Sequence, residues 1–283
     1  MKIFLKPRRN YGFIGPMYLS TLPENIKNMF RINFEFQWYE YFTDGTECNS
    51  QYQVPNIFWP EMIRYNEKWL SIWSNKLIEI GLNALKENNV DLLSPEDYPK
   101  AALQIYDALN LVDIKGKNVA VLGTISPWIE VICLYLEAKN VYSIDYNKPL
   151  IEHQDDDKKR IKAIEMKDIN NCDKFDIVVS FSSIEHDGLG RFGDPINPHG
   201  DIDAINEVYE MLVDDGVFIC GIPIGETNKV VSNWHRIFSK SYIDILFNNF
   251  ERIKDIPYPY GQTELCYDGD DWKNQPVFIL KKK

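Results

Sequence analysis

The sequence predicts an α/β protein built around a doubly wound, mostly parallel sheet. After Gly116, short apolar segments alternate with segments of helical period, which is the pattern of parallel strands joined by crossover helices. Polar and acidic residues follow several of these apolar segments. In open α/β sheets, ligands bind at the carboxyl ends of the strands. We therefore expect one α/β domain over residues 116–283, with its functional site at that edge of the sheet.

The amino-acid composition argues against several classes of function. The chain has 283 residues, and a hydrophobic content of 45% is enough for a substantial core. A formal net charge of -11 disfavours a nucleic-acid partner, because binding to the phosphate backbone needs concentrated Lys and Arg. The five cysteines show no metal-binding spacing and fit a reducing compartment. No apolar run approaches the roughly 18 residues of a membrane helix, and no signal peptide is evident, so we expect a cytoplasmic protein.

Residues 1–115 are expected to form an aromatic-rich, helical and irregular extension on the side of the substrate. Residues 1–60 show no sustained period, apart from one alternating segment at 34–39 that is typical of a strand. Apolar residues from Pro60 to Leu85 recur at near-helical spacing and predict one long helix, either continuous or with a break. A second helix is predicted to begin at residues 94–96 and to end near Gly116. Helices placed in this way often cover a nucleotide pocket, so we expect them to act as a lid.

The α/β region resolves into strands and helices in turn. One helix is predicted after Ser126 as N-cap, with Pro127 at its first position, one after Asp201 and one after Ser239. The last two strands are expected to form an antiparallel hairpin at an edge of the sheet. The predicted strands span residues 118–122, 141–145, 161–165, 176–181, 217–222, 251–256 and 277–280.

A glycine turn and an acidic strand end indicate half of a nucleoside site. Gly123 follows the first strand of the α/β region and allows close approach of a ligand, while Asp145 ends the second strand and can accept hydrogen bonds from both ribose hydroxyls. Ile125 and Pro127 occupy positions where a dinucleotide fingerprint has glycines, which favours a smaller nucleoside over a pyrophosphate. A tight turn and an acidic strand end without any ligand is the alternative.

Acidic residues near the third strand extend this pattern. Glu165 or Asp168 is placed to accept a hydrogen bond from the exocyclic amine of an adenine. For each residue alone, a solvated surface acid is an equal alternative. The order along the chain favours a shared crevice, because Gly123, Asp145, these acids and the loop after Ser180 each follow a different strand.

The succession VAVLG, YSIDYN, IKAIEMKD, FDIVVSFSSIEH and GVFICGIPIG resembles the class I S-adenosylmethionine-dependent methyltransferases. The loop SSIEHDGLGRFGDPINPHGD, with the later NWHRIF, is similar to a narrower family, the domain of unknown function 268, over roughly residues 118–250. The resemblance implies a seven-stranded, Rossmann-like sheet with S-adenosylmethionine in the crevice. It implies no particular substrate.

The chain departs from the methyltransferase pattern at the first strand. Val121 stands where the class usually has an acidic residue, and we expect Glu130 to replace that acid in part. The residues assigned to the cofactor are Gly123, Glu130, Asp145, Glu165, Asp168 and Ser180.

Histidine chemistry suits the transfer step. An O-methyltransferase needs a base near the acceptor hydroxyl, and the unperturbed pKa of histidine lies near neutrality. His186 is the leading candidate, with Glu185 or Asp187 orienting its ring and His235 entering the crevice from the other side. A structural hydrogen-bonding role is the alternative for each histidine.

The remaining polar residues of the loop are assigned to the acceptor, namely Arg191, Asp194 and His199, together with the later Arg236. For Arg191 and Asp194, a salt bridge that holds the glycine-rich loop in shape stays open as an alternative. The spacing of the loop acids and histidines matches no metal template, so no metal site is predicted.

These observations favour a methyltransferase that uses S-adenosylmethionine and acts on an oxygen of a sugar, glycan or other small polar acceptor. A non-catalytic, methyltransferase-like protein that binds a nucleoside or serves as a scaffold is the second hypothesis. A metal-dependent enzyme on the same sheet is the third.

Overall fold

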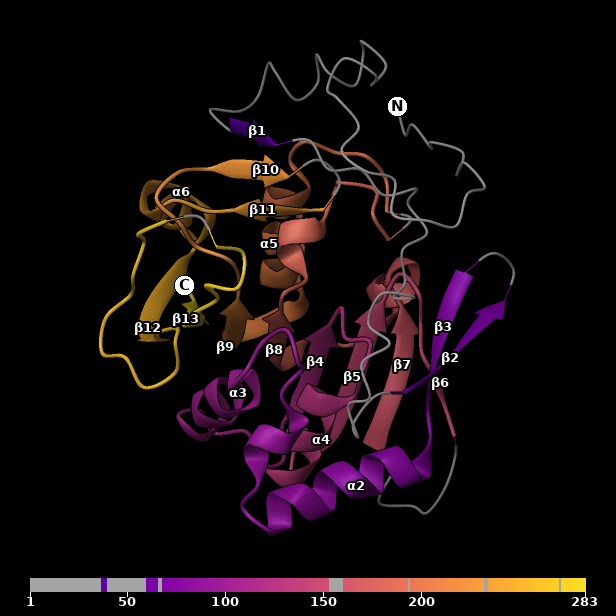
Figure 1. Cartoon of the computed structure of the whole chain (residues 1–283). Coiled ribbons are helices and arrows are strands. Elements are labelled where there is room, and N and C mark those ends of the chain that lie inside the picture. The colour runs from indigo at the N-terminus through magenta and orange to yellow at the C-terminus, as the bar shows by residue number, and fades with distance from the viewer. Residues whose placement is uncertain are drawn as a thin grey trace.

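The computed structural model describes residues 37–39, 60–65, 68–152, 160–192, 194–231, 234–269 and 271–283. Its centre is a seven-stranded sheet with the order β12-β13-β9-β8-β4-β5-β7 (Figure 1). β13 runs in the opposite direction to the other six strands of this sheet. The strands are β4 Asn118–Leu122, β5 Asn140–Asp145, β7 Ile161–Glu165, β8 Phe175–Phe181, β9 Leu212–Gly221, β12 Phe250–Ile256 and β13 Val277–Lys282.

This sheet is the methyltransferase-like Rossmann arrangement that the resemblance implied, and it confirms the predicted fold class. The seven predicted strands all form, and β12 and β13 pair as the expected antiparallel hairpin. The innermost strands, β4 and β8, consist largely of apolar residues because they are covered on both faces.

Helices cover both faces of the sheet. On one face lie α2 Asn75–Lys86, α3 Ala101–Asn110 and α4 Trp128–Tyr135, whose buried residues share one core with Val119 and Val179 of the sheet. On the other face lie α5 Gly200–Met211 and α6 Lys240–Leu246, which share a second core with Val178 and Phe218 (Figure 1). Short 3-10 helices are η2 Val90–Leu93, η4 Met166–Asn171 and η5 Ile184–His186.

The prediction of one long helix from Pro60 to Leu85 is wrong in its first half. Residues Glu61–Tyr65 and Lys68–Trp73 form an antiparallel hairpin, β2 and β3, and α2 begins only after Ser74. The side-chain oxygen of Ser74 accepts a hydrogen bond from the Leu77 amide at 3.1 Å, so a capped helix start interrupts the apolar period. The segment before Ser74 is rich in aromatic and β-branched residues, which favour a strand.

Two predicted helix caps also differ from the structure. Pro127 is the N-cap of α4, although Ser126 was expected there, and His199 is the N-cap of α5 in place of Asp201. The Asp201 carboxylate lies inside the first turn of α5 and accepts a hydrogen bond from the hydroxyl of Tyr242, so it is engaged by α6. Ser239 caps α6 as predicted.

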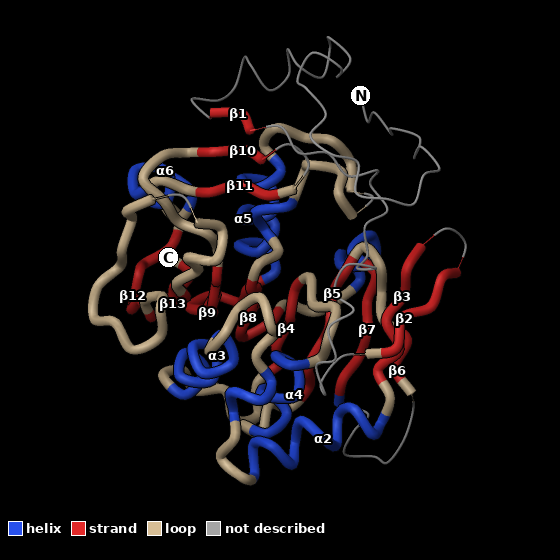
Figure 2. The backbone as a smooth tube through the Cα atoms, viewed as in Figure 1, coloured by secondary structure: helices blue, strands red, loops and turns tan. Residues whose placement is uncertain are grey.

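Two small sheets flank the central one (Figure 2). The hairpin β2–β3 pairs in parallel with β6 Leu150–Ile151, which lies beside β7. The second small sheet contains β1 Gln37–Tyr39, β10 Lys229–Val231 and β11 His235–Ile237. The strand predicted at 34–39 is thus described at its last three residues, and residues 34–36 lie outside the described residues. The proposed division at residues 115 and 116 stays a prediction.

Candidate functional site

The strand order places the site between β4 and β8. The chain runs from β4 outward to β5 and β7, then returns to β8 and continues to β9 on the other side. This reversal between the adjacent parallel strands β4 and β8 is a topological switch point, where ligands bind in open α/β sheets. The Gly123 turn and the loop after Phe181 flank it, and Asp145 lies at the end of the next strand.

Gly123 is required by a contact within the protein. Its φ is +67°, and an added Cβ would lie 2.0 Å from the Oγ and 2.7 Å from the Cβ of Ser183. Gly116 also has a positive φ, of +76°, yet nothing lies within 4 Å of its added Cβ. Gly123 therefore lets the loop after β8 approach the turn after β4. This contact supports the tight-turn interpretation of Gly123, and its role toward a cofactor stays a prediction.

Glu130 lies beneath this turn, in the first turn of α4. Its carboxyl is fully buried and accepts a hydrogen bond from the Thr124 hydroxyl at 2.5 Å. Burial raises the pKa of Glu130 to about 7, against the opposing effect of the Thr124 hydrogen bond. Among the described residues, its Oε2 has no hydrogen-bond partner. The turn thus carries a buried acid with one unused acceptor atom.

The other residues assigned to the cofactor are placed differently. Asp145 and Glu165 pair in register at the ends of β5 and β7, as the strand order predicted. Glu165 accepts a hydrogen bond from Lys167 at 2.8 Å, and Asp168 is exposed on η4. Ser180 is fully buried inside the sheet, so its hydroxyl has no surface on which to meet a ligand. Asp145 and Glu165 therefore lie side by side at the strand ends, and the cofactor role of all four residues stays a prediction.

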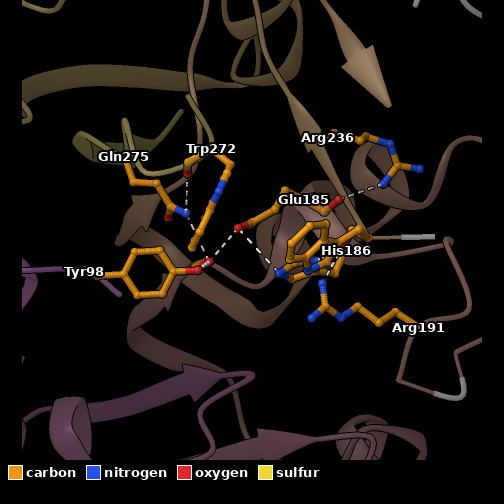
Figure 3. Close-up of polar contacts among 9 residues, drawn as sticks. Tyr98, Glu185, His186, Arg191, Arg236, Trp272 and Gln275 are labelled. Atoms are coloured by element: carbon orange, nitrogen blue, oxygen red, sulfur yellow. Dashed lines mark hydrogen bonds and ion pairs between the residues drawn. The ribbon is translucent and has the colours of Figure 1, made fainter. Parts of the chain in front are cut away.

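At the end of β8, Ser182 connects a side chain of its own loop with side chains from two distant segments. Its hydroxyl lies 2.7 Å from Oε1 of Glu185, 2.6 Å from the hydroxyl of Tyr98 and 3.1 Å from Nε2 of Gln275. The backbone of Ser182 has a φ of +49°, which is uncommon for a residue with a side chain. Figure 3 shows Tyr98 and Gln275 reaching this point from one side and Glu185 from the other.

His186 is held in one tautomer. Its Nδ1 is hydrogen bonded to the main-chain carbonyl of Trp234, and a carbonyl can only accept, so Nδ1 carries the proton. Nε2 then has a lone pair and lies 3.7 Å from Oε1 of Glu185 (Figure 3). Burial, followed by the charge of Arg191, lowers the pKa of His186 well below its usual value. The ring is consequently neutral at physiological pH, and 14% of the side chain is exposed.

Glu185 is the buried partner of this histidine. Its side chain is 1% exposed, and burial raises its pKa to about 7, although the Ser182 hydrogen bond and the charges of Arg191 and Arg236 act in the opposite direction. The carboxyl therefore changes its protonation state close to neutral pH. A neutral imidazole with a free lone pair beside such a carboxyl can accept a proton from a hydroxyl.

Arg191 and Arg236 both contact the loop after β8. The guanidinium of Arg191 lies 5.2 Å from the ring centroid of Trp234 and 5.3 Å from that of Phe192. Arg236 is fully buried and donates to the main-chain carbonyls of Asp187 at 2.5 Å and Glu185 at 3.4 Å. These positions give Arg236 a structural role, and substrate binding by either arginine stays a prediction.

The remaining loop candidates divide between the interior and the surface. Asp194 accepts hydrogen bonds from the amides of Gly190 and Phe192 at 2.9 and 3.1 Å, so main-chain amides tie it to the loop. Its salt bridge with Arg191 stays a prediction. Burial and the charge of Asp194 raise the pKa of Asp187 well above its usual value. His199 lies exposed at the start of α5.

His235 contributes to an aromatic cluster above the loop. It is 5% exposed, and burial lowers its pKa to about 3. Its ring lies 5.3 Å from the Trp234 ring and 6.2 Å from the Trp272 ring, between centroids. The structure thus brings His186, His235 and Arg191 together around Trp234, and the entry of His235 into the crevice stays a prediction.

Sequence reasoning missed Tyr98, Ser182, Gln275 and Trp272 as members of the site. Ser182 lies inside the SSIEH segment, so its place beside Glu185 and His186 could be predicted from the local sequence. Tyr98 and Gln275 are 84 and 93 residues from Ser182, so no local pattern links them to the loop. Within the described ranges, no three histidine, cysteine or acidic side chains are grouped to hold a metal ion. No helix among the described residues has the length and apolar character to cross a membrane.

The family model described as "Caenorhabditis protein of unknown function, DUF268" matches residues 116–263. The chain belongs to the DUF268 family. The match spans β4 to the segment after β12 and includes the whole of the loop after β8. No curated protein matches this DUF268 chain.

Several solved structures are similar to this DUF268 protein. TehB from Haemophilus influenzae is 12% identical with a TM-score of 0.41, and the match covers 63% of this chain and only 61% of TehB. The N-methyltransferase NodS from Bradyrhizobium japonicum WM9, in complex with S-adenosyl-l-homocysteine, is 14% identical with a TM-score of 0.41, over 73% of this chain and 97% of NodS. A putative methyltransferase in complex with the Haloferax volcanii Trm112 methyltransferase activator is 12% identical with a TM-score of 0.45, over 72% and 94%.

Proposed function

We propose that this DUF268 protein is an S-adenosylmethionine-dependent methyltransferase that acts on an oxygen of a small polar acceptor, such as a sugar or glycan, with His186 as the general base. The observation that carries the proposal is the tautomer of His186. The Trp234 carbonyl holds the proton on Nδ1, so the lone pair of Nε2 is available beside Glu185. This base stands at the end of β8, next to the turn after β4 that Ser183 contacts.

The residues at the switch point suit a nucleoside cofactor. Asp145 and Glu165, adjacent at the ends of β5 and β7, offer carboxylate oxygens to ribose hydroxyls and to an adenine amine. Glu130 is as fully buried as Ser180, so in this proposal its carboxyl supports the turn through the Thr124 hydroxyl and does not touch the cofactor. When bound, S-adenosylmethionine would supply an electrophilic methyl group.

In this proposal, the chain itself orients the acceptor and removes its proton. Nε2 of His186 accepts the proton of the acceptor hydroxyl, and the carboxylate of Glu185 at 3.7 Å stabilises the imidazolium that forms. The aromatic rings of Trp234 and Trp272, with centroids 6.2 Å apart, lie close to this base and suit the apolar face of a sugar ring. Most of the rate would come from the positioning of the two reactants.

Binding and turnover test the two halves of the proposal separately. Calorimetry with S-adenosylhomocysteine should detect binding to the wild-type chain, and Asp145→Ala should weaken it by at least about tenfold, as the loss of a ribose hydrogen bond implies. Turnover is measured as S-adenosylhomocysteine formed from S-adenosylmethionine with a panel of methyl glycosides and phenols. His186→Gln should keep the affinity and lose turnover by about 100-fold or more. Full turnover by that variant would show that His186 is not the base.

A second candidate function is favoured by the contact at Gly123. Ser183 fills the space beside this glycine, which is where a ligand would otherwise approach the turn. A non-catalytic, nucleoside-binding or scaffold protein would have the same fold without transfer chemistry. Absence of S-adenosylhomocysteine binding at millimolar concentration would reject the enzyme and favour the scaffold.

A further inference from the structure

We propose that Tyr98 and Ser182 are positioning residues, which form a directed chain of hydroxyl hydrogen bonds that holds Glu185 with its Oε1 toward Nε2 of His186. The chain of bonds joins the segment before α3 to the loop after β8. Its catalytic meaning rests on the proposed function, but the hydrogen bonds themselves can be tested without any turnover.

The direction of each bond follows from the donors available. Nε2 of Gln275 can only donate, so Ser182 accepts from it at 3.1 Å. Ser182 has a single hydroxyl proton, and it donates this proton to Oε1 of Glu185 at 2.7 Å. The oxygen of Ser182 therefore has only acceptor capacity left for Tyr98, and the Tyr98 hydroxyl must be the donor in the 2.6 Å contact.

Packing holds the outer end of this chain in place. The ring of Tyr98 makes edge contacts with Phe181 and Trp272, with centroids 5.4 and 5.5 Å apart. Asp97 lies within 3.8 Å of the Lys273 ammonium, next to Trp272. The segments around residues 98 and 272 thus meet over Ser182, and the Tyr98 hydroxyl cannot leave without breaking two ring contacts.

The backbone holds the inner end. Ser182 has a φ of +49°, and its amide donates to the carbonyl of Gly221 at 2.9 Å. Strained backbone of this kind persists only where the surrounding structure determines it. At this conformation the Ser182 hydroxyl reaches a carboxyl three residues later. Oε2 of Glu185 has no hydrogen-bond partner among the described residues, so Ser182 is what fixes the orientation of the carboxyl.

The chain of bonds also has an electrostatic effect. A hydroxyl that donates to a carboxylate favours the ionised form, so the Ser182 bond lowers the pKa of Glu185 and opposes burial, which raises it. An ionised Glu185 is the form that stabilises a protonated His186. The other ionisable groups that face Glu185 are His186, Arg191, Arg236, Asp187 and Cys220.

Titration of Glu185 in the full-length chain tests the proposal. The ¹³C carboxyl signals of labelled glutamate are followed against pH, and the Glu185 signal is assigned by its loss in Glu185→Gln. The wild-type midpoint is expected near the value of about 7 that the pKa of Glu185 takes in this environment. In Ser182→Ala the midpoint should rise by about one unit. Tyr98→Phe keeps both ring contacts, and it should produce a smaller rise in the same direction.

Tyr260→Phe is the matched control, because the Tyr260 hydroxyl also makes a 2.6 Å hydrogen bond, to Asp107, away from the site. This control should leave the midpoint of Glu185 unchanged. If Tyr98→Phe behaves like Tyr260→Phe, the role of Tyr98 is overturned, and an unchanged midpoint in Ser182→Ala overturns the whole chain of bonds. Should Ser182→Ala fail to fold at its positive φ, Ser182→Gly removes the same hydroxyl with a backbone that suits glycine.

The titration separates this proposal from the proposed function. A shifted midpoint in a chain that binds no S-adenosylhomocysteine would leave the positioning role standing and reject the enzyme. Where the acceptor panel gives turnover, the acid limb of the pH profile should move upward with the Glu185 midpoint in each variant. A purely structural role of Tyr98 would change stability without moving that limb.

Discussion

At the scale of single residues, the site is distinguished by buried acids whose pKa values lie far from the ordinary ones. Burial raises the pKa of both Glu130 and Glu185 to about 7, and each has one carboxylate oxygen without a hydrogen-bond partner among the described residues. Native proteins pair nearly all their buried polar atoms, so unused acceptors at one edge of the sheet are typical of a functional site.

Glu130 should make stability fall as the pH rises. Its pKa is about 7 in the folded chain and ordinary in the unfolded chain, so the folded state binds more protons between these two values. Glu130→Gln removes this penalty and keeps the hydrogen bond from Thr124. Above the folded pKa, at about pH 8, the variant should therefore be more stable by about 3 kcal/mol, and the difference should shrink toward zero near about pH 4, below the pKa of the unfolded chain.

Urea unfolding at a series of pH values measures this difference. Glu79→Gln, on the exposed face of α2, is the control and should leave the pH dependence as in the wild type. If the stability difference between Glu130→Gln and the wild type is the same at both ends of the pH range, Glu130 is not a buried acid with a raised pKa.

At the scale of elements, the local sequence pattern was sufficient to predict the strands of the central sheet but not the hairpin of β2 and β3. The central strands are continuous apolar runs between turns, and a run of this kind can be recognised from a few consecutive residues. The segment from Pro60 to Leu85 mixes a hairpin and a helix whose apolar residues together imitate one helical stripe. Only the pairing of β2 with β3 and of β3 with β6 decides between the two, and pairing is not visible in a single segment.

The loop after β8 depends on Arg236 of β11 for its shape. The buried guanidinium donates to the carbonyls of Glu185 and Asp187, and its Nε lies 3.7 Å from the buried carboxylate of Asp201. Arg236→Lys loses the forked geometry that reaches these groups. We expect the free energy of unfolding to fall by about 3 kcal/mol, since the buried carbonyls of Glu185 and Asp187 lose their donors.

Urea unfolding gives the change in stability, and hydrogen exchange locates it. Amides between residues 185 and 198 should exchange faster in Arg236→Lys than amides of the central strands. Arg252→Lys disrupts the bidentate pair with Asp255 on the edge strand β12, where both side chains are partly exposed, and should cost less than about 1 kcal/mol. Equal costs for the two variants would reject the structural role of Arg236.

At the scale of the whole molecule, the N-terminal helices and the sheet share one core. Buried residues of α2 and α3 belong to the same apolar cluster as Val119, Val179 and Val277 of the sheet. Trp73, at the end of β3, is fully buried, and its indole nitrogen donates to the carbonyl of Ile125 in the turn after β4 at 2.8 Å. The site is therefore assembled from both regions, which is why the role of Tyr98 could not be predicted from the α/β region alone.

A shared core predicts that α3 and the sheet unfold together. Ile105 of α3 is fully buried, and α3 packs on α4, β9 and β13. Ile105→Ala should lower the free energy of unfolding by about 3 kcal/mol, through lost apolar burial and the cavity that remains. Leu111, at the C-terminal end of the same helix, is 53% exposed, so Leu111→Ala should change it little. Native-state hydrogen exchange gives the decisive measurement, because a single cooperative unit loses protection in α3, β4 and β13 by the same free energy. A loss of protection confined to α3 in Ile105→Ala would instead show that the helix opens alone, and the region before residue 116 would then be a lid on an independently stable sheet.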